Sequence, residues 1–149
     1  MGTTSTPRLV RSLLVVMAAL AVDACTRESK SDPMLQQLMA EYRCEAEVLP
    51  TRSAPTDTLT AQERCALVQA ALATVAKQGA TPNGLEPADS AAARGAYIAS
   101  LTQQDSTGKA IRTYWSVNLE LEGRPYDAEV QIDRASGTRS AQRTHKPIG

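Results

Sequence analysis

The chain of 149 residues has no phenylalanine, a single histidine and no net charge at neutral pH. Without a basic excess it lacks the charge signature of a nucleic-acid-binding protein. The single histidine, His145, stands close to the end of the sequence, where a solvated side chain is a more ordinary role than a catalytic base. Four tyrosines and one tryptophan are the only aromatic residues, so the core has to be mainly aliphatic.

Motifs that carry common catalytic chemistry are also absent. The sequence contains no Cys-x-x-Cys, His-Glu-x-x-His, Gly-x-Ser-x-Gly or phosphate-loop pattern. Serines and threonines fall mostly in turns, caps and linkers, and they single out no nucleophile. We therefore predict a protein that is not an enzyme and has no cofactor and no metal site. A hydrolase that works through scattered carboxylates stays open as an alternative.

The N-terminal segment has the pattern of an export signal. Arg8 and Arg11 precede the uncharged apolar run "SLLVVMAALAV", and small residues follow it. This run is too short for a comfortable membrane-spanning helix, which needs about 20 apolar residues. We predict that residues 1–24 form a signal peptide and that the mature chain has no transmembrane helix.

The end of that run, "LAVDAC", resembles the lipobox of bacterial lipoproteins. Val22, Ala24 and Cys25 match the pattern, whereas Asp23 departs from it. The resemblance implies that Cys25 becomes the first mature residue and carries the lipid that anchors the chain to a membrane. Because Thr26, not aspartate, follows the cysteine, the resemblance implies the outer membrane, with the chain facing the periplasm.

The polar residues 25–33 are expected to comprise the lipidated cysteine and a flexible tether. The alternative to an anchored protein is a soluble periplasmic protein with a spare thiol.

Cysteine parity agrees with lipidation. The sequence has three cysteines, and an exported chain normally pairs an even set. If Cys25 is lipidated, Cys44 and Cys65 remain to form one disulfide in the oxidising envelope. Geometry then requires that the first helix ends near Arg43 or that the second helix packs against its other side.

Helical spacing dominates the first half of the domain. An apolar stripe predicts a helix over residues 33–49, followed by a loop over the Pro-rich residues 50–58. Thr60 and Glu63 have the spacing of a capping box, which predicts the start of a second helix that closes at Gly79 in a left-handed cap. The stretch "PADSAAARG" predicts a further short helix.

From residue 96 onward the apolar residues alternate with polar ones, which is typical of strands with one buried face. A type II′ turn at Gly123-Arg124 would place Leu119 opposite Ala128 and Val117 opposite Val130. We predict an α+β domain over residues 34–149, with two N-terminal helices followed by a small antiparallel β-meander.

The stretch "WSVNLELEGRPYDAEVQIDRASG" resembles the strand portion of a PepSY domain. In that family a closing Asp-x-x-Thr/Ser-Gly precedes a short final strand, and Asp133, Ser136 and Gly137 stand in those places. The resemblance covers the region from about residue 96 to residue 141. It implies a small secreted module that binds or restrains another protein, and it implies no catalytic residue.

Four acidic residues are the candidate partner-binding site. The predicted register puts Glu120 opposite Asp127 on the wet face, with Glu122 and Glu129 close by. One interpretation is a patch that docks a basic surface; the other is a solvated face relieved by Arg112, Arg124 or Arg139. The basic residues near the C-terminus are Arg134, Arg139, Arg143 and Lys146. One interpretation is that they contact an anionic surface; the other is that they are solvated side chains of the last strand, where arginines discourage pairing between sheet edges.

These observations together predict an exported, lipid-anchored bacterial envelope protein that acts as a non-catalytic binding or inhibitory module. Its partners would be the membrane, through Cys25, and another envelope protein. An immunity-type lipoprotein that neutralises a periplasmic toxin is a second hypothesis, and an unrecognised hydrolase is the third.

Overall fold

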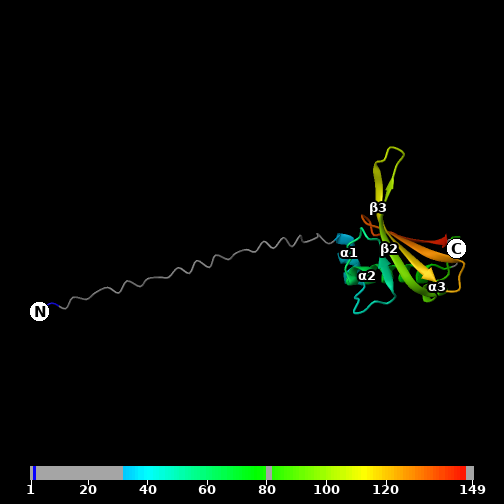
Figure 1. Ribbon diagram of the computed structural model, residues 1–149, viewed down its shortest axis with the longest axis horizontal. Helices are drawn as coiled ribbons and strands as arrows, with labels where there is room; N and C mark the ends of the chain where they lie inside the picture. The colour runs from blue at the N-terminus through cyan, green and yellow to red at the C-terminus, as the bar shows by residue number, and fades with distance from the viewer. Residues whose placement is uncertain (1, 3–31, 80–81, 147–149) are drawn as a thin grey trace. The chain divides into compact units, whose positions relative to one another are not determined.

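Five strands form one mixed sheet in the computed structural model, which describes residues 2, 32–79 and 82–146 (Figure 1). The elements, in chain order, are α1 (Pro33–Glu41), β1 (Thr51–Ser53), α2 (Ala61–Lys77), α3 (Pro87–Ala91), β2 (Ala93–Gln104), β3 (Ala110–Leu121), β4 (Tyr126–Asp133) and β5 (Arg139–His145). The strands lie side by side in numerical order; β1 is parallel to β2, and each later pair is antiparallel. The predicted α+β class is confirmed.

The predicted order of two helices followed by a purely antiparallel meander is wrong. β1 lies between α1 and α2 in sequence, in a stretch predicted to be a loop, and it makes the sheet mixed. Pro50 and Pro55 flank this short strand, which is tolerated because β1 lies at the edge of the sheet. Three residues carry no periodic pattern, so only the pairing of Thr51 with the distant Ala96 makes this stretch a strand.

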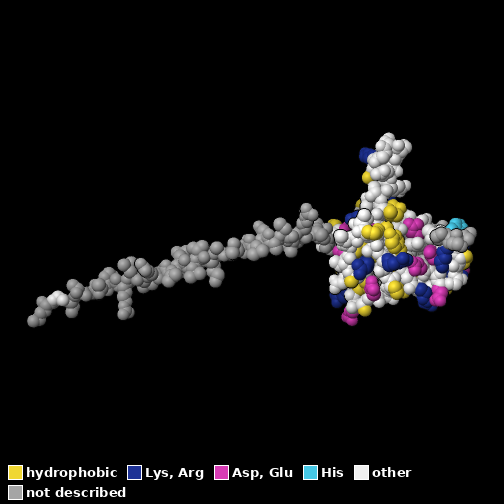
Figure 2. Space-filling model, in the orientation of Figure 1, with side chains coloured by type: hydrophobic (Ala, Val, Ile, Leu, Met, Phe, Trp, Pro, Cys, Tyr) yellow, Lys and Arg dark blue, Asp and Glu magenta, His cyan; other side chains and the backbone are white. Residues whose placement is uncertain are grey.

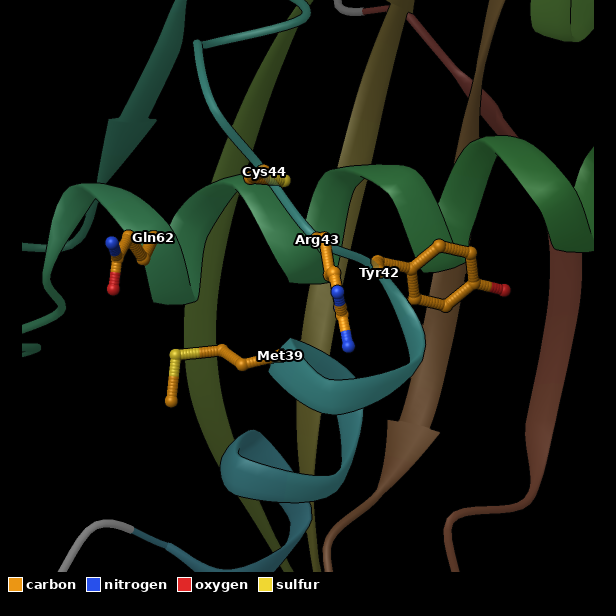
Figure 3. A pocket seen from close by; sticks show the side chains of 5 residues that line it. All are labelled: Met39, Tyr42, Arg43, Cys44 and Gln62. Carbon is orange, nitrogen blue, oxygen red and sulfur yellow. The ribbon is translucent and has the colours of Figure 1, made fainter.

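Alternation along the strands gives the sheet a covered face and an open face. The covered face buries an aliphatic core, and α2 runs across the strands on this side (Figure 3). Its largest fully buried strand residues are Ile98, Val117, Leu119, Leu121, Val130 and Ile132. Polar residues such as Asn118 and Glu129 occupy the alternate positions. The opposite, open face is therefore the part of the sheet that is available to a ligand.

α1 is shorter than the predicted helix over residues 33–49. It ends at Glu41, and Tyr42 already has an extended backbone conformation. The chain then leaves the helix and joins Cys44 to Cys65 of α2 by a disulfide. The first of the two geometries that we considered for this disulfide is therefore the correct one.

Ion pairs fix both ends of α1 to the β4–β5 hairpin. Asp32 caps the start of the helix and also pairs with Arg134. At the other end, a carboxylate oxygen of Glu41 lies 2.6 Å from a guanidinium nitrogen of Arg139. A nine-residue helix is marginal by itself, so these two tertiary contacts contribute to its stability.

The predicted capping box of α2 is confirmed. The Thr60 hydroxyl accepts from the Glu63 amide at 3.2 Å, and the Glu63 carboxylate accepts from the Thr60 amide at 2.8 Å. The predicted left-handed cap at Gly79 is wrong, because the helix ends at Lys77 and the extended residue Gln78 caps it. The short helix predicted after it is α3.

The register predicted for the β3–β4 hairpin is confirmed. Val117 pairs with Val130 and Leu119 pairs with Ala128. Gly123, in the turn between the two strands, has a φ angle of +70°, in the left-handed region that glycine adopts readily. Because a shift of one residue would move these apolar side chains to the wrong face, burial excludes such a shift and restricts the register.

Substitutions at two glycines distinguish the effect of backbone strain from that of steric crowding. Gly123 and Gly137 have φ angles of +70° and +72°, but a Cβ on Gly137 would lie 2.8 Å from the Met34 Cε atom, whereas a Cβ on Gly123 meets open space. We expect Gly123→Ala to lower the free energy of unfolding by about 1 kcal/mol. We expect Gly137→Ala to cost more, because Met34 has to move as well. Urea denaturation of both variants tests this; equal losses would contradict the role of Met34.

Candidate binding site on the open sheet face

A groove of about 540 Å³ lies on the open face of the sheet. It is lined by residues of β2 to β5 and of the segment after β1, and these are Ala54, Thr56, Tyr97, Ala99, Ser100, Leu101, Ser116, Asn118, Asp127, Glu129, Thr144 and His145. β2 and β3 continue past the groove as a projecting hairpin (Figure 1). On the face seen in Figure 2, hydrophobic side chains gather below the base of that hairpin, beside both acidic and basic side chains.

One row of side chains crosses the open face from β2 to β5. Tyr97 pairs in register with Asn118, Asn118 with Glu129, and Glu129 with Gln142. Neighbouring strands lie roughly 4.8 Å apart, and residues in one such row point to the same face. The sheet therefore presents an aromatic ring, an amide, a carboxylate and a second amide as one array.

The hollow of the groove comes from small side chains. Ala99 of β2 pairs with Ser116 of β3 in the next row toward the hairpin tip. Ser116 is only 8% exposed, and its hydroxyl donates to a Glu129 carboxylate oxygen at 2.7 Å. This contact fixes the Glu129 side chain against the floor of the groove.

The two acids in the groove differ in their partners. Asp127 lies 3.5 Å from the Lys146 ammonium and accepts from the Leu121 amide at 3.1 Å. Glu129 accepts from the Ser116 hydroxyl and, at 2.6 Å, from the Gln142 amide, and both donors are neutral. Glu129 is therefore the groove acid without a cationic partner in the part of the chain that the structure describes.

The structure splits the predicted acidic patch. Asp127 and Glu129 line the groove, but Glu120 and Glu122 border a separate surface hollow. There each carboxylate forms an ion pair of 2.6 Å, Glu120 with Arg52 and Glu122 with Arg94. Exposed pairs of this kind add little stability, but they do neutralise the charge of these two acids.

The arginines that we expected to relieve the patch pair with other acids. Their partners lie on the covered side or at strand ends: Arg112 pairs with Asp133, Arg124 with Asp89 and Arg139 with Glu41. The basic residues near the C-terminus have internal partners too. Arg134 pairs with Asp32, and Arg139 pairs with Glu41. Arg143 stacks over Tyr126 at 5.0 Å, and Lys146 pairs with Asp127. These contacts favour a structural role over contact with an anionic surface.

The predicted disulfide is present in the structure. Cys44 and Cys65 are bonded, with their Cα atoms 6.0 Å apart. A hollow of about 200 Å³ lies beside it, and Figure 3 shows the side chains of Met39, Arg43 and Gln62 around it. These residues come from α1, the segment after it and α2, so the hollow is a seam between helices. No acid lines it among the residues described.

Several predicted features lie outside the described residues. They are Cys25, the signal peptide of residues 1–24 and most of the tether. Within the described ranges, no helix is long and apolar enough to cross a membrane. The same ranges contain no cluster of three potential metal-ligating side chains. His145 is exposed at one end of the groove.

The residues that carry the PepSY resemblance form the β4–β5 turn. One Asp133 carboxylate oxygen accepts from the amides of Ala135 and Ser136, at 3.0 and 2.8 Å, and from the Ser136 hydroxyl at 3.0 Å. The other oxygen accepts from Arg112 at 2.8 Å. Gly137 completes the turn with a positive φ angle. The Asp-x-x-Ser-Gly pattern therefore has a structural explanation as a turn.

These contacts predict a pH dependence. The Ser136 amide, followed by the Arg112 guanidinium, lowers the pKa of Asp133 from 3.8 to about 2. A carboxylate with a lowered pKa stabilises the fold above its unfolded pKa, and this stabilisation disappears as the pH falls through the folded pKa. We expect Asp133→Asn to lower the free energy of unfolding at neutral pH, with the gap to wild type closing near pH 2. A gap that stays constant in urea titrations across this range would contradict the assignment.

Comparison with known proteins provides no template for this site. The chain matches no protein-family model, no curated protein and no solved structure. The groove and the sequence are therefore the basis for assigning a function.

Of the residues that line the groove, sequence reasoning named only Asp127 and Glu129 as binding candidates. Tyr97, Ser116 and Asn118 were not singled out, although alternation assigns all three to the wet face. An aromatic side chain on the wet face of a strand is a signal that would have identified Tyr97. The small size of Ser116 matters only in relation to its neighbours on other strands, which the sequence does not reveal.

Proposed function

We propose that this chain is an exported, non-catalytic binding module, anchored through a lipid on Cys25 to the outer membrane and facing the periplasm. The basic start, the apolar run and the lipobox-like "LAVDAC" support export and anchoring. The PepSY-like strands of residues 96–141 support a role in binding or restraining another envelope protein. Mass spectrometry of the mature N-terminus tests the anchor, and an unmodified Cys25 would contradict it.

The observation that carries the binding role is the groove on the open sheet face. It combines apolar surface from Tyr97 and Leu101 with the uncompensated charge of Glu129. Interfaces need apolar area for affinity and complementary charge for orientation and fast association. No lysine or arginine lines the groove among the residues described. The partner chemistry that fits is a basic, extended segment of another envelope protein.

Site-specific photo-crosslinking in cells tests this proposal. A photoreactive amino acid at Ala99 lies in the groove, and the matched control position is Ala76, which is exposed on α2. We expect a discrete adduct from position 99 only, and we expect Glu129→Gln to weaken it. Adducts of equal yield from both positions, or an adduct indifferent to Glu129→Gln, would overturn the proposal. The mass of the adduct distinguishes a resident envelope protein from a delivered toxin.

A further inference from the structure

Most aromatic residues of this domain contact the same type of residue, an arginine. Four of the five aromatic side chains lie under an arginine guanidinium: Tyr42 under Arg139, Tyr114 under Arg112, Trp115 under Arg134 and Tyr126 under Arg143, at 4.8 to 5.6 Å. Tyr97 is the exception within the described residues. It is 38% exposed, and it stands at the β2 end of the row that crosses the groove.

On β1 the register neighbour of Tyr97 is Arg52, which pairs with Glu120, whereas the row on β3 and β4 continues with hydrogen-bond acceptors. Asn118 lies next to Tyr97 on β3, and its amide oxygen is buried and has no hydrogen-bond partner among the residues that the structure describes. An acceptor left in this state destabilises the free protein unless a donor reaches it. Glu129 follows on the next strand, and within the described ranges its carboxylate accepts hydrogen bonds from neutral donors alone. The row thus offers a π face, an unsatisfied acceptor and an anion.

We propose that this row binds an arginine side chain of the partner, a refinement that rests on the function proposed above. The guanidinium would stack on Tyr97, as the domain's own arginines stack on its other aromatic residues. Its N–H groups would donate to Glu129 and, after rotation of the Asn118 amide, to the Asn118 oxygen. Arginine fits better than lysine because its planar, weakly hydrated fork stacks on rings and donates to several acceptors at once.

Fluorescence anisotropy with defined peptides tests this proposal on the mature chain. The probes are three labelled peptides in which threonine alternates with arginine, with lysine or with glutamine, so that like side chains share one side of an extended strand. We expect the arginine peptide to bind about fivefold more tightly than the lysine peptide, from the cation–π contribution. We expect the glutamine peptide to bind most weakly.

Two variants with matched controls assign the residues. Tyr97→Leu is expected to remove the preference for arginine over lysine, whereas Ile111→Ser, an exposed apolar position outside the groove lining, should leave it unchanged. Glu129→Gln should weaken both basic peptides about tenfold. Glu122→Gln should not, because Glu122 pairs with Arg94 outside the groove.

The outcomes separate the two proposals. Equal affinity for the arginine and lysine peptides, both above the glutamine peptide, would overturn the arginine site and leave the basic-partner groove standing. A preference for arginine that survives Tyr97→Leu would also overturn the arginine site as placed. Basic peptides that bind no better than the glutamine peptide would overturn both proposals.

Discussion

Replacing Arg124 with methionine is expected to lower the free energy of unfolding by about 3 kcal/mol, because it leaves a buried charge without its cation. Asp89 is 0% exposed, and one of its carboxylate oxygens lies 3.1 Å from the Arg124 Nε atom. Its other oxygen accepts from the Glu86 amide at 2.9 Å and lies 3.3 Å from the Tyr126 hydroxyl. This cluster fixes α3 to the β3–β4 hairpin.

The same substitution at Arg94 is the matched control. Arg94 pairs with Glu122 at 2.6 Å, but both side chains are largely exposed, so we expect Arg94→Met to cost less than about 1 kcal/mol. Urea denaturation measures both variants. Adding Asp89→Asn to Arg124→Met should recover part of the loss, since it removes the unpaired charge. Equal losses for the two arginine variants would contradict a special role for the buried pair.

Removing the disulfide is expected to cost a similar amount. In the chain-entropy model, closing the loop between Cys44 and Cys65, 21 residues apart, stabilises the fold by about 3 kcal/mol. The double variant Cys44→Ala/Cys65→Ala should therefore unfold at a lower urea concentration than the oxidised wild type. The effect arises mainly from restriction of the unfolded chain, so the folded sheet should persist in the variant.

Reduction of the wild type provides the control for the disulfide. The reduced wild type should approach the stability of the double variant, whereas reductant should leave the double variant unchanged. A loss below about 1 kcal/mol would show that the crosslink adds little, as engineered disulfides sometimes do when the native geometry is strained.

Features that depend on neighbours in sequence could be predicted from the sequence. The Thr60–Glu63 capping box and the pairing of Val117 with Val130 follow from local spacing and from alternation with one buried face. β1 could not be predicted, because its three residues become a strand only by pairing with β2. The end of α1 was also misplaced, because contacts with distant parts of the chain draw the segment after Glu41 away from the helix.

The candidate site was predictable only in part, because it also depends on contacts between residues that are far apart in the sequence. Alternation assigned Asp127 and Glu129 to the wet face, where the structure has them. Which carboxylates keep an uncompensated charge depends on long-range pairs, such as Arg52 with Glu120, and these have no signature in the sequence. Alternation could have pointed to Tyr97 as a wet-face aromatic residue, but that it differs from the other aromatic residues is visible only when their arginine partners are known.

Amide chemical-shift mapping tests the central claim, that the open sheet face is the binding surface, most directly. The mature chain would be titrated with the peptide that alternates arginine and threonine. We predict that the largest shift changes fall on Tyr97, Asn118 and Glu129 and on their neighbours across β2 to β5. Changes concentrated instead around Met39 and Gln62, at the seam beside the disulfide, would contradict the account.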